Sequence, residues 1–78
     1  PRALLHRLML EHLQALHEFY GEAQGVRTAR KHVGWYLCGQ TGARAFLGGF
    51  YALADAGEQL RALDEYFERT AEQGVMAA

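Results

Sequence analysis

The sequence predicts an all-α fold, a small antiparallel four-helix bundle that forms a single domain over residues 1–78. Three observations support this prediction. The length of 78 residues suits one domain. Half of the residues are hydrophobic, which is too many for a disordered chain. These residues recur with the 3.6-residue period of a helix in four segments joined by short turns, at about residues 2–20, 22–39, 43–54 and 56–73.

The first segment, residues 2–20, has one apolar face opposite a charged face that contains Arg7, Glu11 and Glu18. Helical spacing puts Leu5, Leu8, Met9, His12, Leu16, Phe19 and Tyr20 on the apolar face. Gly21 follows, where a glycine commonly ends a helix. We therefore expect the apolar face to be buried and the chain to turn at Gly21.

The second and third segments are separated by a turn at residues 39–42. Residues 22–39 bury Val26, Ala29, Val33, Tyr36 and Leu37 in the predicted bundle. Thr41 is in position to cap the third helix, residues 43–54. That helix carries two adjacent glycines, Gly48 and Gly49, and we expect another backbone to pack closely against them; a weak or kinked helix is the alternative.

The fourth segment, residues 56–73, begins with a capping signal. Asp55 is the predicted N-cap, and Glu58 follows three residues later, which is the spacing of a capping box. Its predicted inner face consists of Ala56, Leu60, Leu63, Phe67 and Ala71. We expect residues 74–78 to fray.

The charges are unevenly distributed along the chain, although the net charge is only −1. Residues 22–44 carry Arg27, Arg30, Lys31 and Arg44 against the single acid Glu22, a balance of +3. Residues 55–72 carry six acids and two arginines, a balance of −4. Local electrostatic fields therefore matter more for binding than the total charge.

The sequence contains no pattern of residues typical of a catalytic or metal site. No His-Glu-x-x-His, Glu-x-x-His or cysteine pair is present, and no glycine-rich phosphate loop. We expect His12 to be a hydrogen-bonded core residue. We expect Cys38 to be unreactive, because the end of a helix disfavours a thiolate. One cysteine suits a reducing cytoplasm, and no apolar run is long enough to span a membrane.

One segment, from Arg27 to Tyr36, combines cations with aromatic residues on one side of a helix. At 100° per residue, Arg27 and Lys31 share the face that points away from the core. Arg30 belongs to the same basic face, Trp35 lies on its edge, and Gly34 leaves room there for a partner. Such a stripe can neutralise phosphates and stack on an unpaired base. A solvated helix face with a half-buried Trp35 explains the same residues, and the stripe alone favours this interpretation, because many exposed helices carry as many cations.

A resemblance favours the first interpretation. The run His-Leu-Gln-Ala-Leu-His-Glu-Phe-Tyr-Gly at 12–21, followed by Gly-Val-Arg-Thr-Ala-Arg-Lys-His-Val-Gly-Trp-Tyr-Leu at 25–37, resembles the carboxy-terminal domain of bacterial B-type tRNA-dihydrouridine synthases. Residues 56–67 resemble the last helix of that domain. The resemblance covers most of the chain, and the Arg-x-x-Arg-Lys-His-x-x-Trp-Tyr run is its specific part.

The resemblance implies a role in a larger enzyme. In that family a (β/α)₈ barrel holds FMN and reduces a uridine of tRNA to dihydrouridine with NADPH, while the helical domain holds the tRNA. The 78 residues match only the helical domain, and Cys38 does not correspond to the catalytic cysteine of the barrel. The chain begins with Pro1, and we expect it to be a piece of such a protein. The tRNA-binding residues that the resemblance implies are Arg27, Arg30, Lys31, His32 and Trp35. Arg44 is added as an RNA-binding candidate because it follows after the turn and could extend the basic stripe.

Three functions remain at this point. The first is a tRNA-binding domain without a catalytic residue, metal or cofactor of its own, whose partners are tRNA and the catalytic barrel. The second is a protein-interaction or self-association bundle in which the acidic fourth helix pairs with the basic second helix. The third, a metal- or flavin-containing catalytic bundle, has the least support because no ligand set is present.

Overall fold

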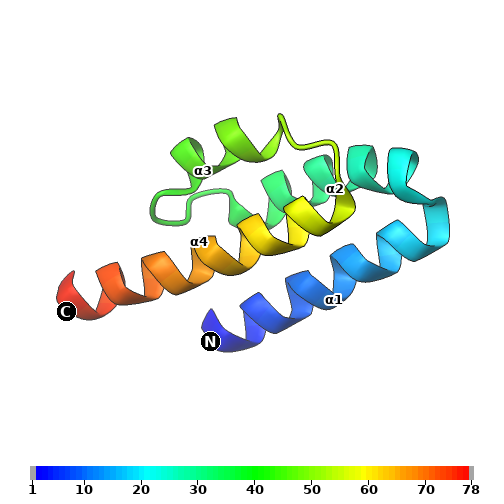
Figure 1. The fold of residues 1–78 in the computed structure, drawn as a ribbon. Coiled ribbons are helices and arrows are strands. Elements are labelled where there is room, and N and C mark those ends of the chain that lie inside the picture. The colour runs from blue at the N-terminus through cyan, green and yellow to red at the C-terminus, as the bar shows by residue number, and fades with distance from the viewer. Residues whose placement is uncertain (1, 78) are drawn as a thin grey trace.

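The structure is a computed structural model that describes the backbone of residues 2–77 and the side chains of residues 2–71. Its regular elements are the helices α1 (Arg2–Tyr20), α2 (Glu22–Leu37), α3 (Ala43–Phe50) and α4 (Ala56–Ala77). Neighbouring α1 and α4 run in opposite directions, and α3 lies on the other side of the molecule from α1 (Figure 1). The prediction of an all-helical fold is confirmed. The finer prediction, a small antiparallel four-helix bundle, stays a prediction, and α3 is the short helix of the four with eight residues.

The helix boundaries differ from the predicted ones at three ends. Helix α2 ends two residues early, because Cys38 is extended and Gly39 takes a φ of +83°. Helix α3 ends at Phe50 rather than residue 54, because the backbone bonds of the next residues shift to carbonyls three positions back. Helix α4 extends to Ala77 instead of ending at residue 73.

The two predicted N-caps have opposite outcomes. Asp55 caps α4, since its Oδ1 accepts a hydrogen bond from the backbone N–H of Glu58 at 2.9 Å. Glu22 adds to this cap from α2, because its Oε2 accepts from the N–H of Ala56 at 2.8 Å. The prediction for Thr41 was wrong: α3 starts after Gly42, which takes a φ of +72°, and no side chain caps it.

The core lies where α1, α2 and α4 meet and extends beneath α3. It consists of Met9, Leu13, Ala29, Val33, Leu37, Ala43, Phe50, Leu63, Tyr66 and Phe67. The predicted apolar face of α1 is partly wrong, since Leu8, Phe19 and Tyr20 are exposed while Leu13 is buried. On α4, the predicted Leu63 and Phe67 are buried. Ala71, which was also predicted to face the core, is exposed, and the buried residues of α4 include Gln59, Tyr66 and Thr70 instead.

The close backbone approach predicted at Gly48 and Gly49 occurs instead at Gly25. A Cβ at Gly25 would lie 2.8 Å from both the Cα of His17 and the carbonyl oxygen of Leu16, so α1 and α2 touch backbone to backbone there. A Cβ at Gly48 or Gly49 would meet nothing within 4 Å. The absence of a side chain at Gly25 therefore sets how closely α1 and α2 pack.

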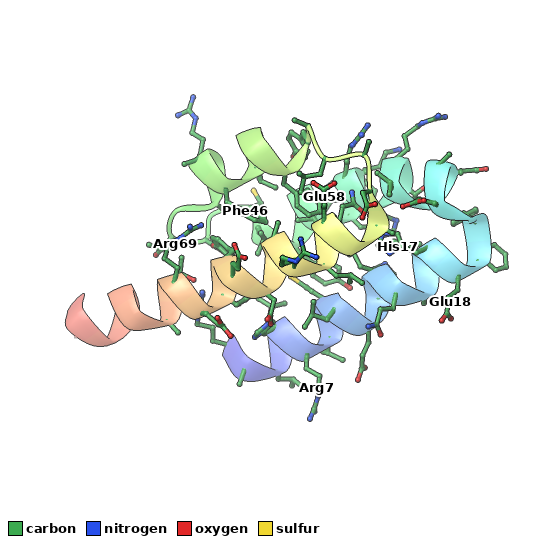
Figure 2. All side chains as sticks on the ribbon, viewed as in Figure 1. Arg7, His17, Glu18, Phe46, Glu58 and Arg69 are labelled. Carbon is green, nitrogen blue, oxygen red and sulfur yellow. The ribbon has the colours of Figure 1, made fainter. Side chains whose placement is uncertain are left out.

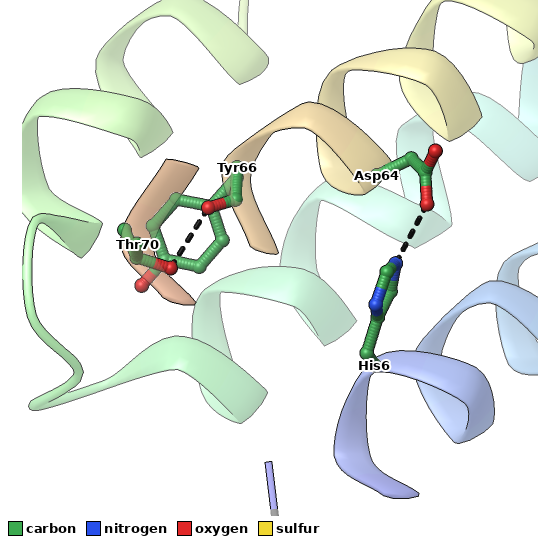
Figure 3. Close-up of polar contacts among 4 residues, drawn as sticks. All are labelled: His6, Asp64, Tyr66 and Thr70. Atoms are coloured by element: carbon green, nitrogen blue, oxygen red, sulfur yellow. Dashed lines mark hydrogen bonds and ion pairs between the residues drawn. The ribbon is translucent and has the colours of Figure 1, made fainter. Parts of the chain in front are cut away.

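Polar contacts join α4 to the other elements. The Nε2 of His6 on α1 lies 2.7 Å from the Oδ1 of Asp64 on α4 (Figure 3). Within α4 itself, the Thr70 hydroxyl donates a hydrogen bond to the Tyr66 backbone carbonyl. The Tyr66 hydroxyl donates to the carbonyl of Thr41 at 2.7 Å, which fixes the α2–α3 turn on α4. Burial raises the pKa of Tyr66, so this hydroxyl stays a donor at neutral pH.

Candidate nucleic-acid interface

Four ring side chains gather where the middle of α1 faces the C-terminal half of α2. They are His12, His32, Trp35 and Tyr36, named here the ring cluster. His12 Nε2 and His32 Nδ1 are 2.9 Å apart and share a hydrogen bond between the two helices. The His32 ring centroid lies 5.3 Å from that of Trp35, and the His12 centroid lies 5.9 Å from that of Tyr36.

The ring cluster lines an open hollow on the protein surface. Trp35 is 66% exposed and Tyr36 is 41% exposed, so both present ring surface to solvent. The two histidines are partly buried beneath them. The hollow is thus bounded by ring surfaces and by imidazole nitrogens, a combination that can accept another flat ring.

Two cations stand beside the ring cluster on α2. Arg27 and Lys31 are exposed and one helical turn apart, as the helical wheel predicts. The Lys31 ammonium lies 5.9 Å from the centre of the Trp35 ring, within the range of a cation–π contact. Positive charge and exposed aromatic surface therefore adjoin each other.

Arg30, which the resemblance assigns to RNA, has a structural contact in this fold. Its Nη2 donates a hydrogen bond to the backbone carbonyl of Leu53 at 3.0 Å, and the side chain is partly buried. This bond ties α2 to the connection between α3 and α4. Arg30 is therefore less available to a phosphate than Arg27 or Lys31.

Two other sequence expectations concern the rim of this surface. Arg44 is exposed on α3, beyond the α2–α3 turn, and so lies on a different element from the cations of α2. The expectation that Gly34 leaves room for a partner was wrong. A Cβ at Gly34 would lie 2.6 Å from the Tyr51 hydroxyl, so a side chain of the same chain already fills this space.

Sequence reasoning missed the contributions of His12 and Tyr36. The predicted hydrogen bond of His12 is present, to His32, but His12 is only partly buried, and Tyr36, which was placed on the core-facing side of α2, is 41% exposed. Twenty residues separate His12 from His32, and only the packing of α1 on α2 brings them together. A helical wheel of one segment contains no signal for such a contact.

His32 is held in its neutral form by its surroundings. Burial lowers its pKa below the ordinary 6.5, and the charges of His12 and Lys31 lower that pKa further. At neutral pH His32 therefore enters its contact with His12 as an uncharged ring. Which of the two nitrogens carries the hydrogen depends on the tautomer.

A second polar junction lies where α1, α2 and α4 meet at the other end of α1. Figure 2 shows His17 directed from α1 toward this junction. Its Nε2 donates to the Gln59 side-chain oxygen at 2.7 Å, and the Gln59 amide donates to the Val26 carbonyl at 3.1 Å. Gln59 is fully buried, so this junction supports the fold and is not open to a ligand.

Among residues 2–71, no three histidine, cysteine or acidic side chains lie together as a metal site would require. Cys38 is exposed directly after α2. Within the described part of the chain, none of the helices has the length and apolar character needed to cross a bilayer.

Comparisons with known proteins give one consistent result. The sequence profile of the dihydrouridine synthase (Dus) family matches residues 2–72. The chain is 49% identical over 71 residues to proteins named tRNA-dihydrouridine synthase B from Salmonella typhimurium and from Escherichia coli strain K12. The same-named protein of Proteus vulgaris is 47% identical over 68 residues. The first two alignments cover 91% of this chain but 22% of each relative, so the chain spans about a fifth of their length.

Proposed function

Because the chain belongs to the dihydrouridine synthase family, we propose that it is the tRNA-docking segment of a B-type tRNA-dihydrouridine synthase. The parent enzyme would reduce uridine in tRNA to 5,6-dihydrouridine, and this segment would hold the substrate. The relatives are named for tRNA, which makes tRNA the expected ligand. In this proposal a catalytic barrel elsewhere in the parent protein is the second partner.

The observation that carries the proposal is the pair of exposed cations beside an exposed aromatic ring. Arg27 and Lys31 can each neutralise a phosphate, and the release of counterions then favours binding. Trp35 adjoins Lys31 and is largely solvent-exposed, although indole is among the more costly surfaces to leave in water. A polyanion with unstacked bases is the ligand whose chemistry matches both features.

No residue of this chain is assigned to FMN or NADPH, which the resemblance implies for the parent enzyme. The ring-cluster hollow is bounded by four side chains and is open to solvent, whereas FMN also needs a site for its phosphate. The sequence contains no glycine-rich phosphate loop. Flavin chemistry therefore belongs to the parent barrel in this proposal. The cytoplasmic location of the protein stays a prediction.

The proposal is tested by measuring the affinity of the chain for unmodified tRNA at several salt concentrations between about 50 and 200 mM. We expect affinity to fall steeply as salt rises. The variant with Arg27→Gln and Lys31→Gln should bind more weakly, and the slope of log K against log salt should shrink by about two.

A matched control removes two other exposed cations, Arg7→Gln and Arg61→Gln. Arg7 points away from the bundle on α1 (Figure 2), and Arg61 is exposed on α4. The control loses the same charge and should keep the affinity and salt slope of the parent sequence. Equal weakening in both variants would mean that the total charge, rather than this face, binds RNA.

Self-association is the alternative function, and a specific feature favours it. The acidic residues Glu58, Glu65 and Glu68 are exposed on α4 and could contact the cations of α2 in a second copy. Sedimentation would then show concentration-dependent dimers that dissociate in salt, with no binding of tRNA. That pair of results would replace the docking proposal.

A further inference from the structure

We propose that the ring cluster is a binding site for one unpaired nucleobase of the docked RNA, stacked on Trp35 between the imidazoles and Tyr36. This inference rests on the proposed docking function and adds a specific subsite to it. It starts from the hollow that His12, His32, Trp35 and Tyr36 line, in which every lining residue is a ring. Such a surface suits a flat, aromatic ligand better than an aliphatic one.

The exposed rings make the site accessible without a change of fold. Trp35 is 66% exposed, and its nearest ring neighbour in the cluster, His32, is tilted by 54° rather than stacked on it. Part of the indole face is therefore free for another ring. Stacking of one base on such a face is sequence-tolerant, because every base has a π surface.

The histidine pair gives the lining of the hollow hydrogen-bonding capacity. His12 Nε2 and His32 Nδ1 share one hydrogen in their mutual bond. In two neutral rings, the remaining nitrogens, His12 Nδ1 and His32 Nε2, are then one donor and one acceptor, whichever ring donates. The pair can exchange these roles by a change of tautomer, and so can match base edges of either polarity.

Charge decides between RNA and a protein side chain as the occupant. The Lys31 ammonium lies 5.9 Å from the centre of the Trp35 ring, and Arg27 is exposed one turn away on α2. The residues that line the hollow include no acid. A base stacked on Trp35 would bring its own phosphate toward these cations, whereas an aromatic side chain would bring no negative charge to them.

The test uses the fluorescence of Trp35, which is the sole tryptophan of the sequence. The chain is titrated with unmodified tRNA, with a short unstructured single-stranded RNA, and with a blunt RNA duplex of equal phosphate number. We expect the tRNA and the single strand to quench Trp35 emission and to shield it from acrylamide. The duplex should bind in low salt with little quenching, because its bases are already stacked.

Variants supply an independent measurement with fluorescently labelled RNA. Trp35→Ala should weaken single-stranded RNA binding roughly 5- to 150-fold. Trp35→Phe should recover a large part of this loss, since a smaller ring still stacks. Phe19→Ala is the matched control, because Phe19 is an exposed aromatic residue, 81% accessible, outside the ring cluster. Thermal melting of each variant confirms that it folds.

The outcomes separate the subsite from the docking function. Salt-sensitive RNA binding with unchanged Trp35 emission, and with Trp35→Ala equal to the parent sequence, overturns the subsite and leaves docking intact. Equal quenching by the duplex also overturns it. Failure to bind any RNA overturns both proposals together. A loss of self-association, rather than of RNA affinity, in Trp35→Ala would assign the ring cluster to a protein contact.

Discussion

Individual residues in this chain have functions that their chemical type alone does not reveal, and the glycines illustrate this. Gly25 lets the backbone of α1 approach α2, whereas Gly48 and Gly49 face open space. The Gly48–Gly49 pair is conspicuous in the sequence, because two adjacent glycines are unusual within a helix. The low helix propensity of a glycine is visible in a sequence. The close packing that a glycine permits depends on a neighbouring element that the sequence does not identify.

The first prediction compares alanine at Gly25 with alanine at Gly48. Gly25→Ala places a methyl group 2.8 Å from α1 backbone atoms, so the helices must move apart. We expect the free energy of unfolding to fall by about 1–3 kcal/mol, which is typical of overpacking. The methyl group of Gly48→Ala meets no atom within 4 Å, so this variant should raise the free energy of unfolding by about 0.5–1 kcal/mol. Urea denaturation measures both, and equal effects would contradict the assigned contact.

The second prediction separates Arg30 from Arg27, two arginines three residues apart on α2. Arg30→Gln removes the bond to the Leu53 carbonyl, and hydrogen bonds to charged groups contribute about 1.5–3 kcal/mol. We expect a clear decrease in Tm for Arg30→Gln. Arg27 is exposed, so Arg27→Gln should change Tm little while it weakens tRNA binding. The reverse pattern in melting and binding assays would show that these assignments are wrong.

At the scale of the helices, polar side chains determine how α1 sits on its neighbours. Each of three histidines on α1 reaches a different residue: His6 bonds Asp64, His12 bonds His32, and His17 bonds Gln59. Apolar burial brings these helices together without direction, while hydrogen bonds fix their rotation and register. The histidines thus complement the core contacts of Met9 and Leu13.

The third prediction concerns the junction of His17, Gln59 and Val26. Gln59→Leu removes both bonds of the buried amide and leaves His17 without its acceptor. We expect a loss of about 1–3 kcal/mol in the free energy of unfolding. The double variant His17→Leu/Gln59→Leu should lose less than the sum of the two single variants, because its second change removes a group that is already unpaired. Strict additivity in a double-mutant cycle would argue against the bond.

The elements themselves were predictable because periodicity and capping are local properties. All four helices, the Asp55 cap and the buried face of α2 with Val26, Ala29 and Val33 followed from spacing. The ends of α2 and α3 were misplaced, since backbone turns at Gly39 and after Phe50 depend on packing. In the ring cluster, Trp35 and His32 could be grouped from the sequence, whereas Tyr36 on the same helix was assigned to the core and His12 joins only through the packing of α1 on α2.

For the molecule as a whole, the coupling of α1 to α2 through His12 and His32 makes stability depend on pH. The folded state lowers the pKa of His32 below 6.5, which means that protons bind more readily to the unfolded chain. Stability is therefore fully present above about pH 6.5 and declines as pH falls toward the folded-state pKa. The unfolded ensemble gains the proton first.

The fourth prediction follows from the lowered pKa of His32 in the folded state. The urea midpoint should be lower at about pH 5.5 than at about pH 7.5, and His32→Gln should reduce this difference. The variant is compared with itself at the two values, so its own stability loss cancels. An unchanged pH difference in His32→Gln would show that groups other than His32 cause the dependence.

The contact of Gly25 with the α1 backbone also has a consequence for how this sequence can vary over generations. Every other amino acid carries a Cβ, so each missense change of this codon inserts an atom where Leu16 and His17 already lie. No chemically conservative substitute exists at this position, because size alone and not polarity is the constraint. In a library of all single substitutions, Gly25 should therefore be intolerant throughout, while Gly48 accepts a wide range of residues.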